Sequence, residues 1–288
     1  MYRLTLLGEV SLEGAAGPLS GRIVQRRQLA LLSLLGSSRG RPMTREKVVG
    51  RLSGDRPEAK ARRALSDTLY LIRDALGDEA TIEGPREGLR LNEDLIWSDV
   101  TAFEEAADQG GWHEAVELYG GPFIDGFYVD WAGEFERWME GERRRLASRH
   151  QDALEHLAEA AAAEGYWSGA AVLWEERAGE EPTNSRVILR LMRAEAAAGN
   201  VPGALEHARV HELLLREELG LPVPDDSAPV LVVLPFENLG DAQNQHFADG
   251  SPRSSRPGWL PFPAWASSLA PARFSTKGRP WTGSPPRT

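Results

Sequence analysis

The 288-residue chain is 41% hydrophobic and 26% charged, values typical of a soluble globular protein, and its length suggests about two domains. It has no cysteine, which excludes disulfides, thiolate zinc sites and a cysteine nucleophile and fits a cytoplasmic location. No run of about 18 apolar residues occurs, so neither a membrane-spanning helix nor a membrane partner is expected.

The net charge of −10 is distributed unevenly along the chain. Residues 1–76 carry 14 Lys or Arg against 7 Asp or Glu, whereas residues 101–224 carry 11 against 24. A basic head on an acidic body indicates a polyanionic partner for the head, from which the body is repelled.

The first segment combines short strands with one helix. Residues 2–6 alternate as a strand does, glycines and Pro18 follow as turn signals, and residues 22–24 suggest a short extended run. A helix is then expected up to Gly36, because Leu29, Leu32 and Leu35 form one apolar stripe.

Two further helices and a hairpin follow. Thr44 is a suitable N-cap for a helix that runs to about Leu52, and a third helix is expected from near Glu58 to just before Gly77. Residues 80–83 and 89–91 bracket a turn-rich stretch and predict a β-hairpin. The order of strands, three helices and hairpin predicts a winged helix-turn-helix domain over residues 1–98.

Residues 99–224 read as helices in repeating pairs. Gly165-Tyr166-Trp167 and Gly199-Asn200-Val201 are 34 residues apart, and Ala170 and Ala204 keep the same spacing. This period, with small residues where helices cross, is typical of tetratricopeptide repeats. An earlier unit begins at Gly111, with extra residues around 120–138, and five tryptophans near helix starts and crossings are expected to pack in the core: Trp112, Trp131, Trp138, Trp167 and Trp174.

The C-terminal part differs in composition. Residues 229–235 read as a buried strand within segment 225–250, whereas residues 251–288 hold eight prolines, three tryptophans, six basic residues and no acidic one. We predict disorder for this tail, and the abrupt change after Gly250 suggests a shifted reading frame. The expected fold class is mainly α with a small β component: a winged helix, an all-α tetratricopeptide-like domain and a disordered tail.

The third helix carries the candidate DNA-reading residues, because an α-helix fits the major groove of DNA. Its outward face presents Lys60 and Arg63 as donors to guanine, Asp67 as an acceptor from cytosine, and Tyr70, with Arg62, Ser66 and Arg73 beside them. Predicted phosphate contacts are Arg22, Arg26, Arg27, Arg45, Lys47, Arg51 and Arg62, and Arg86 and Arg90 of the hairpin could reach the minor groove. The alternative is an ordinary solvated helix with salt links.

Enzyme motifs are weak. Gly36–Gly40 fits G-x-S-x-G but follows a helix, whereas a nucleophile elbow follows a strand. His207 and His211 share a helix face without an evident third metal ligand. No catalytic residue, cofactor or metal is therefore expected.

Several stretches resemble the bacterial transcriptional activator family of antibiotic-regulatory-protein type. They are residues 28–32, Ala61–Ser66 and Leu71–Gly77, then Ser98–Phe103, the Gly-Pro-Phe stretch Tyr119–Phe127, Glu134–Trp138 and Arg190–Arg193. The resemblance covers about residues 3–222 and implies an OmpR-like winged helix joined to a tetratricopeptide-like activator domain. The chain departs from the family where Leu52 is followed by Ser53-Gly54 instead of tryptophan, and Pro229–Gly250 resembles the start of a TolB-like module.

This resemblance implies a regulator that binds double-stranded promoter DNA, as a dimer or on successive sites, and contacts RNA polymerase or a sigma factor. The alternative function is a tetratricopeptide scaffold with a vestigial DNA-binding domain, which would bind a protein or peptide and no DNA.

Overall fold

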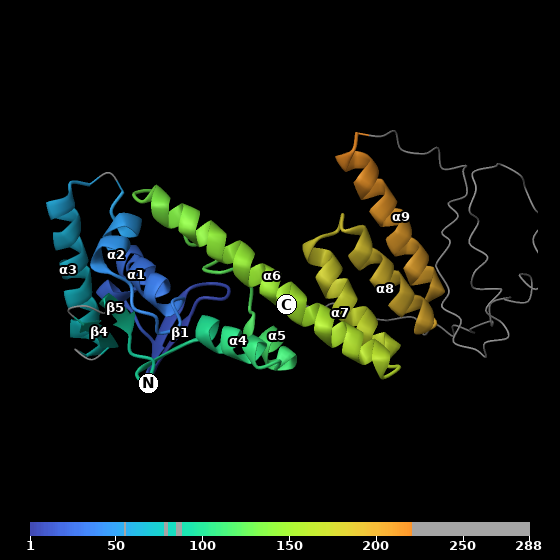
Figure 1. Ribbon diagram of the computed structural model, residues 1–288, viewed down its shortest axis with the longest axis horizontal. Coiled ribbons are helices and arrows are strands. Elements are labelled where there is room, and N and C mark those ends of the chain that lie inside the picture. Colours follow the sequence, from blue (N-terminus) through green and yellow to red (C-terminus); the bar gives the residue numbers. More distant parts are fainter. Residues whose placement is uncertain (55, 78–79, 85–87, 221–288) are drawn as a thin grey trace, which may run out of the picture. The chain divides into compact units, whose positions relative to one another are not determined.

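The computed structural model describes residues 1–54, 56–77, 80–84 and 88–220, with the side chains of 81–84 excepted (Figure 1). All of them belong to the first of two units into which the chain divides, residues 1–232. The sequence-based expectations for segments 225–250 and 251–288, the TolB-like start included, lie outside the described residues, and the boundary at 98/99 stays a prediction.

The N-terminal sheet has four strands in the order β3-β2-β1-β6. Strand β1 pairs antiparallel with β2 and parallel with β6, with Tyr2 opposite Ile96 and Leu4 opposite Leu12. Leu4 and Leu12 are buried, as alternation along a half-buried strand requires. The strands are β1 (Tyr2–Thr5), β2 (Ser11–Gly14), β3 (Gly17–Pro18) and β6 (Ile96–Ser98).

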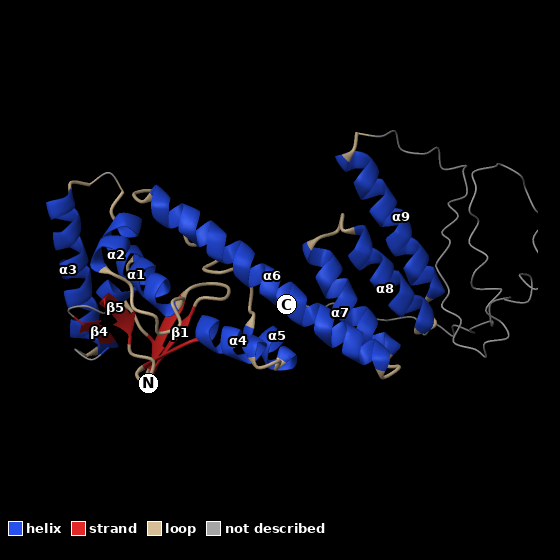
Figure 2. Cartoon of the chain, viewed as in Figure 1, coloured by secondary structure: helices blue, strands red, loops and turns tan. Residues whose placement is uncertain are grey.

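Three helices follow the first three strands, as the apolar stripes predicted: α1 (Arg26–Gly36), α2 (Arg45–Leu52) and α3 (Glu58–Leu76). The hydroxyl of Thr44 accepts a hydrogen bond from the backbone N–H of Lys47 at 3.3 Å, which confirms the predicted N-cap. The apolar face of α3 is buried as expected through Leu65, Leu69, Ile72 and Leu76. Figure 2 shows these helices next to the short strands of this region.

The prediction of an extended run at residues 22–24 is wrong. Residues Gly21–Val24 form a 3-10 turn, η1, in which Gly21 has a φ of +81° and the N–H of Gln25 donates to the carbonyl of Arg22 at 3.3 Å. The 3-10 turn buries the side chain of Ile23 and leads directly into α1. Residues 22–24 therefore need no strand to bury their apolar side chain.

The predicted hairpin is present as β4 (Thr81–Gly84) and β5 (Gly88–Leu91). Met43, just before α2, adds to its edge: the N–H of Met43 donates to the carbonyl of Leu89 at 2.8 Å and the reverse bond measures 2.7 Å. The order of elements is that of a winged helix-turn-helix, with the wing fastened to the segment that precedes α2.

The remaining described chain is helical. Each helix from α6 to α9 packs against the next, and α4 packs on both β1 and β6. The six helices are α4 (Asp99–Asp108), α5 (Trp112–Leu118), α6 (Gly133–Ala163), α7 (Trp167–Glu180), α8 (Ser185–Ala197) and α9 (Val201–Glu218).

The 34-residue period corresponds to repeated helix pairs. Gly165 and Gly199 have φ values of +80° and +89°, and each stands just after a helix, where the left-handed conformation favours glycine. Ala170 and Ala204, at the equivalent positions of α7 and α9, have at most 1% of their surface exposed. The predicted fold class is therefore confirmed for the described residues: a winged helix with a small sheet, followed by an all-α repeat domain.

One hydrophobic core connects the sheet with the helical region, from Leu4 to Ala153 on α6. The Gly-Pro-Phe stretch continues the pairing of the β1 segment: Leu7 lies opposite Phe123, and the N–H of Ile124 donates to the carbonyl of Leu6 at 2.6 Å. The N–H of Gly8 donates to the carbonyl of Pro122 at 3.0 Å. The distinctive motif thus connects the winged helix to the helical region.

Candidate nucleic-acid interface

The outward face of α3 presents the side chains that the sequence predicted as base-reading. Lys60, Arg63, Asp67 and Tyr70 are all exposed, and Tyr70 keeps 67% of its surface accessible although it is a large aromatic residue. An exposed face that combines cations, a carboxylate and a phenol offers donors and acceptors to base edges.

Two of the three flanking residues of α3 bond to neighbours on the same helix. Arg62 forms an ion pair with Glu58 at 2.6 Å, and the hydroxyl of Ser66 donates to the carbonyl of Arg62 at 3.1 Å. Arg73 is half-buried near the end of the helix. These three positions border the exposed face of α3.

The start of α2 supplies the second group of candidate contacts. Lys47 is exposed and Arg45 is half-buried in the first turn. The first turn of a helix presents free N–H groups and the positive end of the helix dipole, so this position is suited to a phosphate.

The wing is described in part. Arg90 lies half-buried on β5, whereas Arg86 lies outside the described residues.

Arg51, predicted as a phosphate contact, packs against Trp138 on α6. Its guanidinium stands 5.4 Å from the ring centre of Trp138, a cation–π contact with the start of α6. Burial lowers the pKa of Arg51, while the charges of Glu142 and Glu134 act in the opposite direction. Arg51 therefore helps to hold the helix-turn-helix against α6.

The turn between α2 and α3 contacts a loop that sequence reasoning did not connect with it. A Cβ placed at Gly54 would clash with the carbonyl oxygen of Trp131, so the two backbones are in close contact. The guanidinium of Arg27 also lies 5.7 Å from the ring centre of Trp131. Where the family carries a tryptophan after Leu52, this chain has a glycine turn with the loop of Trp131 packed against it.

The other motifs have structural roles. Ser38 of the G-x-S-x-G match donates its hydroxyl to the carbonyl of Leu35 at 2.7 Å in the loop that ends α1. His207 lies 3.6 Å from Glu195, and His211 contacts Ser185 instead, so the two histidines do not converge. Among the described residues no cluster of three or more His, Asp or Glu side chains is placed to hold a metal ion, and no helix is long and apolar enough to cross a membrane.

The tryptophans pack largely as predicted. Trp174 is 2% exposed, Trp138 packs edge-on against Phe123, and Trp112 stacks on His156. Trp131 and Trp167 are half-buried.

Comparison with known proteins assigns the helical region. Residues 98–227 match the family described as the bacterial transcriptional activator domain. The chain carries a bacterial transcriptional activator domain. This finding confirms the resemblance to activators of antibiotic-regulatory-protein type that the sequence suggested.

A solved structure supports the fold of both regions. The chain is similar to Mycobacterium tuberculosis EmbR, solved in complex with a low affinity phosphopeptide, with a TM-score of 0.56 and 21% sequence identity. The match covers 76% of this chain and 61% of the EmbR chain, so this chain spans less than two thirds of that protein. Comparison with curated proteins returned no match.

Proposed function

We propose that the chain is a transcriptional activator whose winged helix binds double-stranded promoter DNA through α3. The observation that supports the proposal most is the exposed face of Lys60, Arg63, Asp67 and Tyr70, on a winged helix that precedes an activator domain. Lys47, Arg45 and the wing residues would position the domain on phosphates, while the face of α3 reads bases.

The charge distribution favours DNA contact by the N-terminal part of the chain rather than by the helical region. The basic residues 1–76 are attracted to DNA, and the acidic residues 101–224 are repelled from it and left available to proteins. We infer that the activator domain contacts RNA polymerase or a sigma factor, and that two copies occupy repeated sites on the promoter.

The proposal is tested by measuring the affinity of the full chain for a pool of random duplexes over a range of salt concentrations. About six phosphate contacts would reduce affinity roughly a thousandfold between 50 and 200 mM salt. The double variant Lys60→Glu with Arg63→Glu should lose most of this binding. The matched control is Arg144→Glu with Arg209→Glu, which changes net charge equally on exposed positions of α6 and α9 and should retain binding.

Two results would contradict the proposal. One is no binding to any duplex even at low salt, and the other is an equal loss in the two double variants. The former would favour the scaffold alternative, in which the helical domain binds a protein and the winged helix has no DNA partner.

A further inference from the structure

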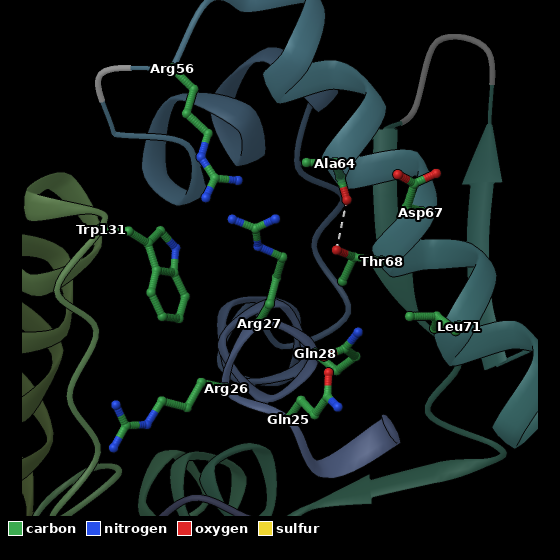
Figure 3. A pocket seen from close by; sticks show the side chains of 10 residues that line it. All are labelled: Gln25, Arg26, Arg27, Gln28, Arg56, Ala64, Asp67, Thr68, Leu71 and Trp131. Atoms are coloured by element: carbon green, nitrogen blue, oxygen red, sulfur yellow. Dashed lines mark hydrogen bonds between the residues drawn. The ribbon is translucent and has the colours of Figure 1, made fainter. Parts of the chain in front are cut away.

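A cavity of about 480 Å³ opens at the start of α1, between that helix, α3 and the loop that carries Trp131 (Figure 3). Figure 3 shows the side chains of Arg27 and Arg56 extending toward each other across it, with the indole of Trp131 alongside. Arg26 and Arg27, predicted as phosphate contacts, and Asp67 of the α3 face are among its lining residues, but the activator domain match does not account for the cavity.

Three cations line the cavity. In the described part of the chain, Arg26, Arg27 and Arg56 form no ion pair with an acidic side chain, although most arginines of the activator domain do. Burial, and then the charge of Arg56, lower the pKa of Arg27. Two mutually repelling guanidinium groups that form no ion pair with a described acidic side chain are stabilised by an anion placed between them.

The start of α1 adds a second positive contribution. Gln25 occupies the N-cap without a side-chain cap, and the first turn of this 11-residue helix has no acidic residue. The free N–H groups of that turn and the helix dipole therefore favour an anion at this end of the cavity.

Two buried polar groups at the cavity lack partners. The side chain of Gln28 belongs to a residue that is only 4% exposed, and its Oε1 has no hydrogen-bond partner among the described residues. The indole Nε1 of Trp131 is also a buried atom without a hydrogen-bond partner among the described residues. An unmade hydrogen bond by a buried group is costly, so these atoms point to a ligand that both donates and accepts.

The chemistry of the lining defines that ligand. Arginines, helix N–H groups and an indole N–H suit a phosphate, which only accepts hydrogen bonds. Gln28 Oε1 and the carboxylate of Asp67 are acceptors and require hydroxyl or amino donors on the same molecule. A phosphate of the DNA backbone supplies no such donor, whereas a nucleotide carries phosphate, ribose hydroxyls and, in adenine, guanine or cytosine, an amino group.

We propose that this cavity binds a nucleoside phosphate, with its phosphates on Arg27, Arg56 and the start of α1, and a hydroxyl or amino group directed to Gln28. The volume lies within the range of small-molecule sites. This site goes beyond the proposed DNA-binding function and does not depend on it.

The position of the site gives it a route to regulation. Asp67 lines the cavity and also belongs to the exposed face of α3, so one wall of the nucleotide site is part of the candidate DNA interface. Any effect of the nucleotide on DNA affinity would be matched by an equal effect of DNA on nucleotide affinity.

The test is calorimetric titration of the full chain with ADP, adenosine and inorganic pyrophosphate. We expect one ADP per chain and no binding of adenosine, which lacks phosphate. Arg27→Gln and Arg56→Gln should each weaken ADP binding about tenfold or more. Arg22→Gln, which removes a nearby exposed cation that does not line the cavity, should leave it unchanged. Because Arg56 is exposed, its variant folds even if Arg27→Gln does not.

A further variant separates the two parts of the ligand. Gln28→Met keeps the volume of the buried side chain but removes its acceptor, so it should weaken ADP more than pyrophosphate. The proposal is wrong if ADP up to about 1 mM gives no binding, or if the Arg27, Arg56 and Arg22 variants bind ADP equally. It is also wrong if the cavity variants lose affinity only for duplex DNA, since the arginines would then serve the DNA backbone.

Discussion

The carboxylate of Asp99 accepts a bifurcated hydrogen bond from the backbone N–H of Leu6, with its two oxygens 2.8 and 2.9 Å from the nitrogen. Asp99 is the first residue of α4, and Leu6 directly follows β1. The same carboxylate also accepts from the N–H of Leu7 at 2.8 Å, at the point where the parallel pairing of β1 with β6 ends. A single buried side chain therefore joins the first strand of the winged helix to the first helix of the activator domain.

Asp99→Ala should lower the free energy of unfolding of the full chain by about 1–3 kcal/mol, because the buried N–H groups of Leu6 and Leu7 lose their acceptor. Urea unfolding followed by circular dichroism measures the change. Glu105→Gln, an exposed position on the same helix, is the control and should stay within about 0.5 kcal/mol of the wild type. Equal stability of the two variants would contradict the structural role of Asp99.

The activator domain has a comparable connection at Glu155 on α6. This carboxylate accepts from Arg177 on α7 at 3.2 Å and from Arg186 on α8 at 2.6 and 2.8 Å. The hydrogen bond from Arg186 is the largest cause that lowers the pKa of Glu155 below its usual value of 4.5. A lowered pKa in the folded state means that the stabilisation is present above pH 4.5 and is lost as pH falls through the folded pKa.

Glu155→Gln should therefore destabilise the protein by about 1–3 kcal/mol at neutral pH, since Arg177 is buried and, among the described residues, would keep Glu181 as its one acidic partner. The difference between wild type and variant should shrink as the pH is lowered below 4.5, because the wild-type carboxylate becomes protonated. Unfolding of the wild type and the variant, measured from pH 7 to pH 3, tests whether the difference in stability shrinks. Glu159→Gln, whose contact with Arg190 is exposed and measures 3.8 Å, should have little effect at any pH.

The helix-turn-helix turn offers a steric test at Gly54. Gly54→Ala would place a Cβ against the carbonyl oxygen of Trp131 at a φ of +57°, so the loop or the turn must shift. We expect a loss of about 1–3 kcal/mol in unfolding free energy. Gly50→Ala in α2 meets no neighbour within 4 Å and should instead stabilise the protein by about 0.5–1 kcal/mol. A neutral Gly54→Ala would show that the loop of Trp131 does not rest on the turn.

The helices and the candidate face of α3 could be predicted from the sequence because their signals are local. Leu65, Leu69 and Ile72 recur at helical spacing, and that stripe places Lys60 and Arg63 on the opposite side. The 34-residue period is also a pattern along the chain, and it located the starts of α7 and α9 correctly.

The contacts between distant segments could not be predicted in this way. Trp131 lies against Gly54 and Arg27, and Arg51 lies against Trp138, yet no periodicity links these positions. Arg51 is basic and follows Val48 and Val49 on a short helix, so composition alone favoured a phosphate contact. The nearest available signal was the departure from the family pattern after Leu52, which marked the site where the loop of Trp131 packs.

Base reading and phosphate contact differ in their dependence on sequence and salt, and this difference separates Arg63 from Lys47. Arg63→Ala should weaken binding to the preferred duplex by about 1–3 kcal/mol and reduce the preference for it over other sequences. Lys47→Ala should weaken binding to all duplexes similarly and reduce the slope of log affinity against log salt by about 1. Both side chains are exposed, so neither change is expected to unfold the protein.

Selection of the preferred duplex from a random pool, followed by fluorescence anisotropy at several salt concentrations, measures both effects. Arg209→Ala on α9 removes the same charge far along the chain and should alter neither preference nor slope. If Arg63→Ala lowers affinity for every duplex equally, Arg63 contacts phosphate and the base-reading assignment for the centre of α3 is incorrect. If Lys47→Ala changes sequence preference, Lys47 contributes to base reading and its assignment as a phosphate contact is incorrect.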